Sequence, residues 1–552
     1  MTTTNSDDKS KKEENNAAKS RIPFNAWKIL AILSCISIMV LYAETMLIPA
    51  IPHLIDDFSI NYSTSSWILS SYLIAGAISV PVAGKLSDVY GRKRILLLVL
   101  MIYTVGVVGA AFSTNIYFLL ISRTIQGIGM SVFPIVFAIV QSEFPRNKIA
   151  IAQGTLASMF AFGGVLGLVV GGNLVEYFGW RSTFYSVIPV AILLIFIITK
   201  RVHVKESYPE VHPPSERRTQ SVYEGDKRDV VDFPRNEKKP TKSVKQVVAA
   251  RLDFKGVIFL AITITCFLSA LTLVQSSSYS SSISSTTTTA SESETLLALP
   301  TVYWQLAVLA AAGSISLVLF ITVEKKSVSP IIDLKLVSKK PILISNILVI
   351  IWGICTFAVF QTIPILVQSP VQAGGLSGNA VNAANVQLPF SITSLIFGPT
   401  SGFIISKVGS PRVIFTGALV MTCGFFTIMV LSASVIHLAS TLAVIGIGLA
   451  LLNVGQLNVN ATSVSPTLIG TSLGINTLLR YVGSAVGPAI AGMLMQTNQT
   501  VIEIGSNVTK SFPSGQSYSF IFAVALALSI IAVILSAKML QVFKKKDVAS
   551  IS

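Results

Sequence analysis

Charged side chains are scarce in this sequence, and their scarcity excludes a soluble globular protein. Only 12% of the 552 residues are Asp, Glu, Lys or Arg, and 52% are hydrophobic, whereas a soluble domain carries roughly a quarter charged residues. Apolar runs of about 20 residues recur along the chain, and each is long enough to cross a hydrocarbon core of about 30 Å as a helix. Since a backbone in lipid must satisfy its own hydrogen bonds, these runs predict a bundle of membrane-spanning helices.

Cysteine and histidine are also rare, which argues against metal sites and disulfides. Each occurs four times, the cysteines singly within apolar segments and the histidines far apart, and neither shows the spacing of a metal site or a disulfide framework. A phosphate loop of the form Gly-x-x-x-x-Gly-Lys-Ser/Thr is absent, which argues against direct use of ATP. Because no hydrolytic nucleophile motif is present either, we do not expect an enzyme or a metal or organic cofactor.

The net charge of +16 would suit a nucleic-acid partner, but the distribution of the basic residues favours a membrane topology. Basic residues concentrate in the N-terminal tail and at 92–94, 146–148, 201–251, 325–340 and 544–546. These stretches alternate with the apolar runs so that all of them fall on one side, as cytoplasmic loops do. We therefore expect a multi-pass protein of the cell (plasma) membrane with both termini cytoplasmic and no nucleic-acid partner.

Fourteen apolar runs are predicted to span the membrane, and they divide the chain into seven parts. The predicted parts are a cytoplasmic tail (1–27), a six-helix bundle (28–200), a flexible cytoplasmic linker of mixed charge (201–252), two inserted helices (253–323), a cytoplasmic loop (324–340), a second six-helix bundle (341–540) and a cytoplasmic tail (541–552). A Ser/Thr-rich outer loop joins the inserted helices. The first run is long enough to span, so we expect a retained helix rather than a cleaved signal peptide.

Three sequons fall in loops that this topology places outside the cell. Asn61, Asn498 and Asn507 each begin an Asn-x-Ser/Thr triplet, the acceptor sequence for N-glycosylation. The alternative is a chance occurrence, because such triplets are frequent.

An internal repeat relates the two halves of the chain. Residues 81–94, "PVAGKLSDVYGRKR", align with residues 399–412, "PTSGFIISKVGSPR", and residues 163–172, "GGVLGLVVGG", align with residues 483–492, "GSAVGPAIAG". Each pair lies at the second or the fifth span of its half. The repeat predicts two six-helix halves with two helices inserted between them.

Two six-helix repeats are the architecture of the major facilitator transporters, and three motifs strengthen the resemblance. "GKLSDVYGRKR" (84–94) resembles the family's loop between helices 2 and 3, "RTIQGIGM" (123–130) its helix-4 motif, and "GGVLGLVVGGNLVEYFGWRSTFY" (163–185) the helix-5 motif of its antiporters. With fourteen spans, "LDFKGV" at 252–257 and "SPIIDLKL" at 329–336, the chain is similar to the drug:proton antiporters with fourteen spans over residues 28–540.

This resemblance implies an all-α major facilitator fold and secondary active export. The substrate would be a small amphipathic compound, cationic or neutral, exchanged for protons by alternating access, as in multidrug efflux and drug resistance. The implied partners are the substrate, protons as the coupling ion and the lipid bilayer, and the implied state is a monomer. The alternatives are a carrier of the same fold for a specific metabolite, peptide or sugar, and a membrane sensor that does not transport.

The loop after the second span is a candidate gating motif. Its residues are Gly84, Asp88, Gly91, Arg92 and Arg94. The bases fix orientation, and the glycines permit close helix contact. The resemblance implies that Asp88 meets the amino end of a helix in the other half in the outward-facing state, where the helix dipole favours a carboxylate. The chain departs from the family at Val89, where a basic residue is usual, and the second copy has Ser406 in place of Asp88.

Small residues mark the fifth span as a close-packed helix. They are Gly163, Gly167, Gly171 and Gly172. One interpretation is ordinary tight packing; the other is a seal between the halves against ion leak. The sequence is compatible with both.

Two charged residues lie inside predicted spans, where charges are costly and usually functional. Glu44 in "MVLYAETMLIPAIP" and Arg123 each lie about seven residues from the outer end of a span, about 10 Å deep at 1.5 Å per residue. By resemblance their helices line the central cavity, which makes Glu44 the candidate proton carrier. The alternative is a static ion pair. The family often has this acid one position earlier, where this chain has Ala43.

The second half has no acid within its spans and offers polar residues instead. These are Gln361, Asn453 and Gln456, with Asn458 and Asn460 beyond them. They would hydrogen-bond a substrate or one another across helices, and the second role is the commoner one for any single residue. Arg480 matches an arginine that the family often has.

Overall fold

The computed structural model describes most of the chain. It describes residues 24–145, 148–202, 254–283, 292–327, 332, 334–430, 434–464, 468–505 and 508–549. The predicted linker from residue 203, residues 1–23 of the N-terminal tail and Asn507 lie outside this set.

The first half consists of six long helical segments, two of them interrupted. They are α2 (Phe24–Thr45), continued by η1 (Ile48–Ala50) and α3 (Ile51–Asp57); α4 (Tyr62–Tyr90); α5 (Arg92–Ala111); α6 (Ile116–Gly127), continued by η2 (Ile128–Ser131) and α7 (Val132–Glu143); α8 (Ile149–Phe178); and α9 (Arg181–Arg201). Pro49 stands within η1, where a missing backbone N–H interrupts the α-helical ladder.

The inserted helices and the second half follow in the same manner. They are α11 (Phe254–Ile283), α12 (Glu292–Lys326), α13 (Leu334–Val337), α14 (Lys340–Gln368), η3 (Val371–Ala373), α15 (Ala380–Val408), α16 (Ser410–Val430), α17 (Val435–Thr462), α18 (Ile469–Thr497), β1 (Gln499–Gly505), β2 (Val508–Pro513) and α19 (Gly515–Ala549).

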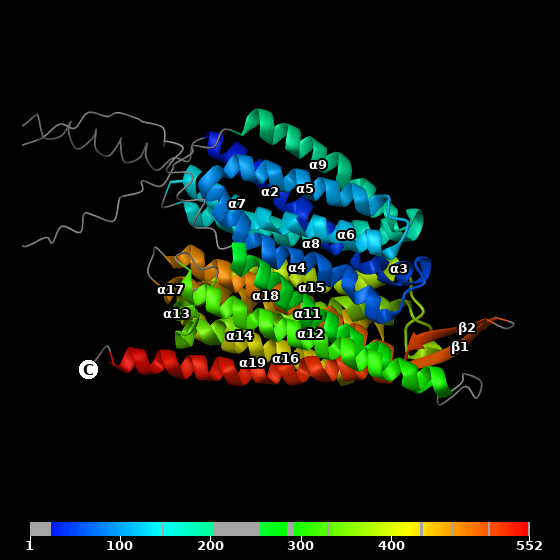
Figure 1. Cartoon of the computed structure of the whole chain (residues 1–552). Helices are drawn as coiled ribbons and strands as arrows, with labels where there is room; N and C mark the ends of the chain where they lie inside the picture. The colour runs from blue at the N-terminus through cyan, green and yellow to red at the C-terminus, as the bar shows by residue number, and fades with distance from the viewer. Residues whose placement is uncertain are drawn as a thin grey trace, which may run out of the picture.

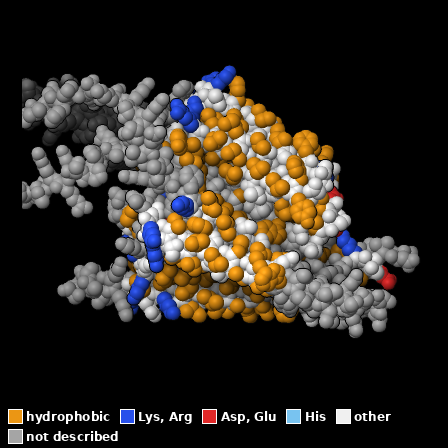
Figure 2. Space-filling view, in the orientation of Figure 1, with side chains coloured by type: hydrophobic (Ala, Val, Ile, Leu, Met, Phe, Trp, Pro, Cys, Tyr) orange, Lys and Arg blue, Asp and Glu red, His pale blue; other side chains and the backbone are white. Residues whose placement is uncertain are grey.

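The fold predicted from the sequence is confirmed as a polytopic helical membrane protein. Thirteen helical segments of the described residues are long and apolar enough to cross a membrane, and α11 adds a shorter apolar stretch, Lys255–Ala270. The long helices lie side by side (Figure 1), and apolar side chains cover most of the visible flank of the bundle (Figure 2). The count of fourteen spans stays a prediction.

A β-hairpin at one end of the bundle was not predicted. Strands β1 and β2 pair antiparallel, with Gln499 opposite Pro513, and they project from the end of the bundle that also carries α3 (Figure 1). We call this the hairpin end. The opposite end, where α9, α12 and α15 finish near Lys200, Lys326 and Lys407, is called the Lys-rich end.

The internal repeat reappears as matched geometry in the two halves. Gly91 and Gly409 both end a helix with positive φ, 97° and 86°, a conformation in which glycine avoids the strain of a side chain. A Cβ placed on Gly163 would lie 2.4 Å from the carbonyl oxygen of Ile38, and one on Gly483 would lie 2.4 Å from that of Ile350. Helix α8 therefore packs on α2 as α18 packs on α14.

The halves touch each other at the hairpin end. The main pairs across the halves are α4 with α18 and α8 with α15. A Cβ on Gly492 of α18 would lie 2.8 Å from the carbonyl oxygen of Tyr62, and a Cβ on Gly172 of α8 would lie 2.5 Å from the Cβ of Ala384. Glycine at these positions lets the backbones of the two halves come into contact.

The same four helices are separated at the Lys-rich end. A Cβ on Gly84 of α4, Gly154 of α8, Gly402 of α15 or Gly474 of α18 would meet no other atom of the described residues within 4 Å. The burial of α15 agrees, because most of its buried residues, from Ala380 to Phe390, lie toward the hairpin end. The structure is thus closed at the hairpin end and open at the Lys-rich end.

Candidate functional site

Arg123 is fully buried and is held by groups other than a carboxylate. Its Nη1 donates to Oε1 of Gln126 (2.8 Å) and its Nε to the carbonyl oxygen of Ile68 (3.3 Å). The guanidinium also lies over the ring of Tyr72, 4.3 Å from the centroid, an attractive cation–π arrangement. Helices α4 and α6 together fix the position of this charge.

Glu44 is buried on α2, 7% exposed, without an ion pair to Arg123. The ion pairs Arg181–Asp57 and Lys510–Asp56 involve neither Glu44 nor Arg123. One carboxyl oxygen of Glu44 and the Nη2 of Arg123 have no hydrogen-bond partner in the described part of the chain. The static ion pair considered from the sequence is therefore not formed in this conformation.

A second cation, Arg480, acts on Glu44 from the other half. The guanidinium groups of Arg480 and Arg123 both lie within electrostatic range of Glu44. Arg480 lies on α18, partly buried beside the ring of Tyr481. One cation of each half therefore acts on Glu44. The family-like arginine at this position was the signal that could have placed Arg480 in the predicted site.

The polar residues of the second half make contacts across helices. Gln361 on α14 is buried and its Nε2 donates to Oγ of Ser65 in the first half (3.0 Å). Gln456 on α17 accepts a hydrogen bond from Nε1 of Trp352 (3.0 Å). Oε1 of Gln361 and Nε2 of Gln456 have no partner among the described residues. Each glutamine therefore combines a bond across helices with one group left for another ligand.

The other three polar residues are asparagines, and all of them lie on α17. Asn453 is half-buried. Asn460 donates from Nδ2 to Oγ of Ser345 (2.8 Å), and Asn458 accepts from Oγ of Ser410 (2.7 Å). Asn458 and Asn460 thus form hydrogen bonds to neighbouring helices, which is the commoner of the two roles considered from the sequence.

The predicted gating motif lies at the Lys-rich end. Asp88 is exposed in the last turn of α4, and Gly91 separates α4 from α5. Arg92 donates from Nη1 to the carbonyl oxygen of Ala138 on α7 (2.7 Å), whereas Arg94 is exposed. Because the halves are apart at this end, the contact of Asp88 with the second half belongs to another conformation and stays a prediction.

We expect Asp88→Asn to favour the conformation seen here. Asparagine keeps the shape but loses the charge that a helix amino end attracts, an effect that shifts the balance of the two conformations roughly 2- to 30-fold. Transport should slow, while a cysteine introduced at the hairpin end becomes less accessible to an impermeant maleimide. Ser406→Asn, at the matching position of the other half, is the control. Unchanged accessibility in Asp88→Asn would count against the latch.

The helix-5 glycines divide between two neighbours. Cβ atoms on Gly163 and Gly167 would lie 2.4–2.5 Å from carbonyl oxygens of α2, and one on Gly171 would lie 2.5 Å from that of Met46, directly after α2; all three contacts are within the first half. Gly172 instead faces α15 of the second half. Three glycines of the motif therefore pack within the first half, and the fourth, Gly172, contacts the second half.

The sequons that are described lie at the hairpin end. Asn61 is exposed, and its Oδ1 accepts from the backbone N of Thr64 (2.6 Å) as the N-cap of α4. Asn498 is half-buried between α18 and β1, and its Nδ2 donates to Oγ1 of Thr497 (3.2 Å). Their modification stays a prediction, as does that of Asn507.

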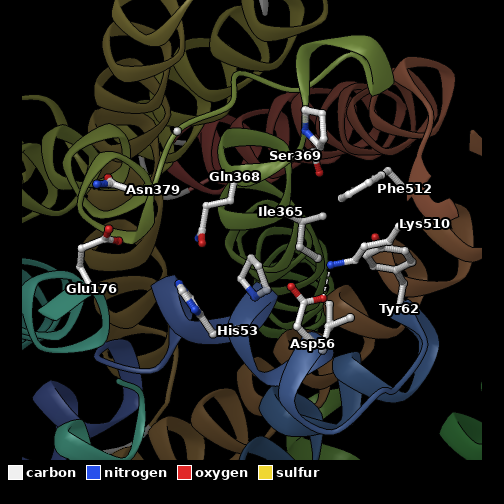
Figure 3. Close-up of a pocket in the computed structure, with 14 residues that line it drawn as sticks. His53, Asp56, Tyr62, Glu176, Ile365, Gln368, Ser369, Asn379, Lys510 and Phe512 are labelled. Carbon is white, nitrogen blue, oxygen red and sulfur yellow. Dashed lines mark hydrogen bonds and ion pairs between the residues drawn. The ribbon is translucent and has the colours of Figure 1, made fainter. Parts of the chain in front are cut away.

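A cavity of about 320 Å³ lies at the hairpin end, between the halves. His53 and Asp56 of α3 and Glu176 of α8 line one side, and Gln368 and Lys510 belong to the other half (Figure 3). Among the described residues no group of three His, Cys, Asp or Glu side chains is arranged to hold a metal ion.

Comparisons with known proteins agree with the helical repeat. The model of the Major Facilitator Superfamily matches residues 33–386 and 293–488. The chain is 26% identical over 460 residues to the uncharacterized MFS-type transporter YwoD of Bacillus subtilis, covering 82% of this chain and 86% of YwoD. It is 23% identical to the multidrug transporter protein MdtP of Bacillus subtilis, covering 81% and 71% of the two chains.

A solved structure shares the fold at low sequence identity. The xylose transporter XylE from E. coli superposes with a TM-score of 0.56 at 13% identity, covering 93% of this chain and 96% of XylE.

Proposed function

The chain belongs to the Major Facilitator Superfamily, and from this premise we propose that it exports small amphipathic compounds, cationic or neutral, in exchange for protons. The observation that carries this proposal is the buried Glu44, which forms no ion pair among the described residues and lies within electrostatic range of Arg123 in one half and Arg480 in the other. A buried carboxyl group of this kind is placed to alternate between a protonated and a charged form.

Alternating access is supported by the unequal ends of the bundle. The halves touch at the hairpin end through Gly172 and Gly492 and are apart at the Lys-rich end near Gly84 and Gly474. Since basic loops face the cytoplasm, we assign the Lys-rich end and both termini to the cytoplasm and the protein to the plasma membrane. The conformation is then inward-facing, ready to receive a substrate for export.

The proposed exchange uses the single negative charge of Glu44. A proton that enters from outside neutralises the carboxylate and reduces its attraction to the two arginines. A cationic substrate that enters from the cytoplasm is attracted to the ionised carboxylate, and the proton leaves to the cytoplasm. Because the charged acid is costly in lipid without a partner, proton and cation compete for one group.

A broad substrate range is supported by two buried glutamines and by a relative. The glutamines at 361 and 456 each retain one free polar group, which suits neutral compounds as well as cations. The similar protein MdtP is named a multidrug transporter. Since both halves of one chain enclose Glu44, we propose that the monomer transports.

The proposal is tested in proteoliposomes that contain the purified full chain. A panel of lipophilic cations and neutral amphipathic compounds is offered under an imposed pH difference. We expect accumulation of at least one compound to follow the size of the pH difference and to collapse when an ionophore equalises the pH. A folded protein that moves every compound independently of the pH difference would refute proton exchange.

A further inference from the structure

The β-hairpin of the second half contacts the first half at two points. Nζ of Lys510 on β2 lies 2.5 Å from Oδ1 of Asp56 on α3. The hydroxyl group of Tyr62, at the start of α4, donates to the carbonyl oxygen of Ser511 (3.3 Å). We call these four residues the clasp.

Both sides of the clasp are anchored in their own half. At the base of the hairpin, the carbonyl oxygen of Asn498 accepts from the backbone N of Ser514 (2.9 Å) and from Oγ of Ser517 (2.5 Å). On the opposite side, Asp57, next to Asp56, accepts from Nε1 of Trp180 (2.7 Å). Each half therefore carries its part of the clasp with it when the halves move.

The clasp stands directly beyond the closed seam between α4 and α18. The backbone N of Tyr62 donates to Oε1 of Gln496 (3.1 Å), and Gly492 faces the carbonyl oxygen of Tyr62. Separation of the halves at this end moves the hairpin away from α3. The charge pair of Lys510 and Asp56 must then be broken.

The second interface between the halves, that of α8 with α15, ends in a different contact. Oε2 of Glu176 on α8 accepts from the backbone N of Ala380 at the start of α15 (3.0 Å). Figure 3 shows Glu176 and the Lys510–Asp56 pair on opposite sides of the cavity. The clasp is therefore a contact of one seam only, added by the hairpin.

From these contacts we propose that the hairpin is an outer clasp, which stabilises the conformation closed at the hairpin end through the Lys510–Asp56 pair. The inference rests on alternating access and is independent of proton coupling and of the substrate. Both side chains are partly exposed, 39% and 53%. Because exposed ion pairs contribute modestly, the clasp adjusts the balance of conformations without locking it.

The test measures a distance across the hairpin end in the full-length protein. Spin labels are attached at Tyr117, at the start of α6, and at Ile436, at the start of α17, both well exposed and placed away from the clasp. The four native cysteines are replaced, and pulsed electron resonance gives the distance distribution in nanodiscs. Gly492→Leu, whose side chain would meet the backbone of Tyr62, supplies the reference for a separated hairpin end.

We expect Asp56→Asn and Lys510→Gln each to raise the ratio of separated to closed molecules about 1.5- to 5-fold. The double reversal, Asp56→Lys with Lys510→Asp, should return the ratio toward the parent value. Glu503→Gln, which removes an exposed charge from β1 of the same hairpin, should leave it unchanged.

The clasp is refuted if both single variants keep the parent ratio, if Glu503→Gln changes it equally, or if the reversed pair behaves like the single variants. No step of this measurement uses transport. A failure of the proposed proton exchange would therefore leave the distance result unaffected.

Discussion

Glu44→Gln is expected to reduce proton-driven accumulation of substrate to the level of protein-free vesicles. Glutamine keeps the size of the side chain and removes the proton that must be bound and released in each cycle. Binding of a neutral substrate should survive, and so should its slow equilibration across the membrane. The measurement is substrate movement in proteoliposomes at several imposed pH differences.

Two further variants define what the result means. Glu44→Asp retains an acid on a side chain shorter by one methylene group, so partial coupling should remain. Glu503→Gln, an acid-to-amide change on the exposed hairpin, should transport as the parent does. If Glu44→Gln still accumulates substrate in proportion to the pH difference, the assignment is wrong and another acid, with Asp88 the first to test, carries the proton.

Gly492→Leu is expected to force the hairpin end apart without unfolding the protein. A Cβ at this position would lie 2.8 Å from the carbonyl oxygen of Tyr62 and 3.0 Å from the Cβ of Ser66. Overpacking of this kind costs about 1–3 kcal/mol, and here the cost falls only on the conformation in which the halves touch. The ratio of separated to closed molecules should rise roughly 5- to 150-fold.

The readout is labelling of a cysteine placed in the seam. Ser70→Cys lies on α4, where the native Oγ donates to the carbonyl oxygen of Ala485 (2.7 Å), and an impermeant maleimide should reach it only when the seam opens. Gly84→Leu is the comparison at the other end of the same helix: open space surrounds Gly84 in this conformation, its leucine would obstruct only closure of the Lys-rich end, and labelling should stay low. A folded Gly492→Leu protein with parent-level labelling would contradict the prediction.

Gly163→Leu should have a different effect. Its Cβ would lie 2.4 Å from the carbonyl oxygen of Ile38 within the same half, so the cost applies in every conformation. We expect a lower thermal midpoint in detergent rather than greater labelling at Ser70→Cys. Equal labelling in Gly163→Leu and Gly492→Leu would show that the two glycines are not distinguished in this way.

The long helices and the internal repeat could be predicted from the sequence. The short β-hairpin and the contacts between the two halves could not. Apolar runs and the Gly91/Gly409 match are local signals, and the helix break at both glycines follows from them. The hairpin is short and lies in a polar loop, although Thr500, Val501 and Ile502 are β-branched residues typical of strands. In a topology of fourteen spans this segment is only a connection between two helices, so no strands were predicted there.

The positions of the site residues along their helices could be predicted from the sequence, but their partners could not. The positions of Glu44 and Arg123 along their helices follow from residue counts. The approach of Arg480, more than 400 residues away in the sequence, depends on how α18 crosses the first half. Likewise, small residues at 171 and 172 predict a close-packed helix, but adjacent residues point about 100° apart on a helix. Only the docked halves show that Gly171 contacts the first half and Gly172 the second.

Helix α4 carries residues of both ends on one rod. Tyr62, at its start, contacts α18 and the hairpin, and Asp88 lies near its other end. Its 29 residues span roughly 43 Å. When α4 rocks as a rigid helix against α18, it acts as a lever: moving one end toward α18 moves the other end away. The interface between the halves therefore cannot open at both ends at once, and this geometry opposes a continuous pore.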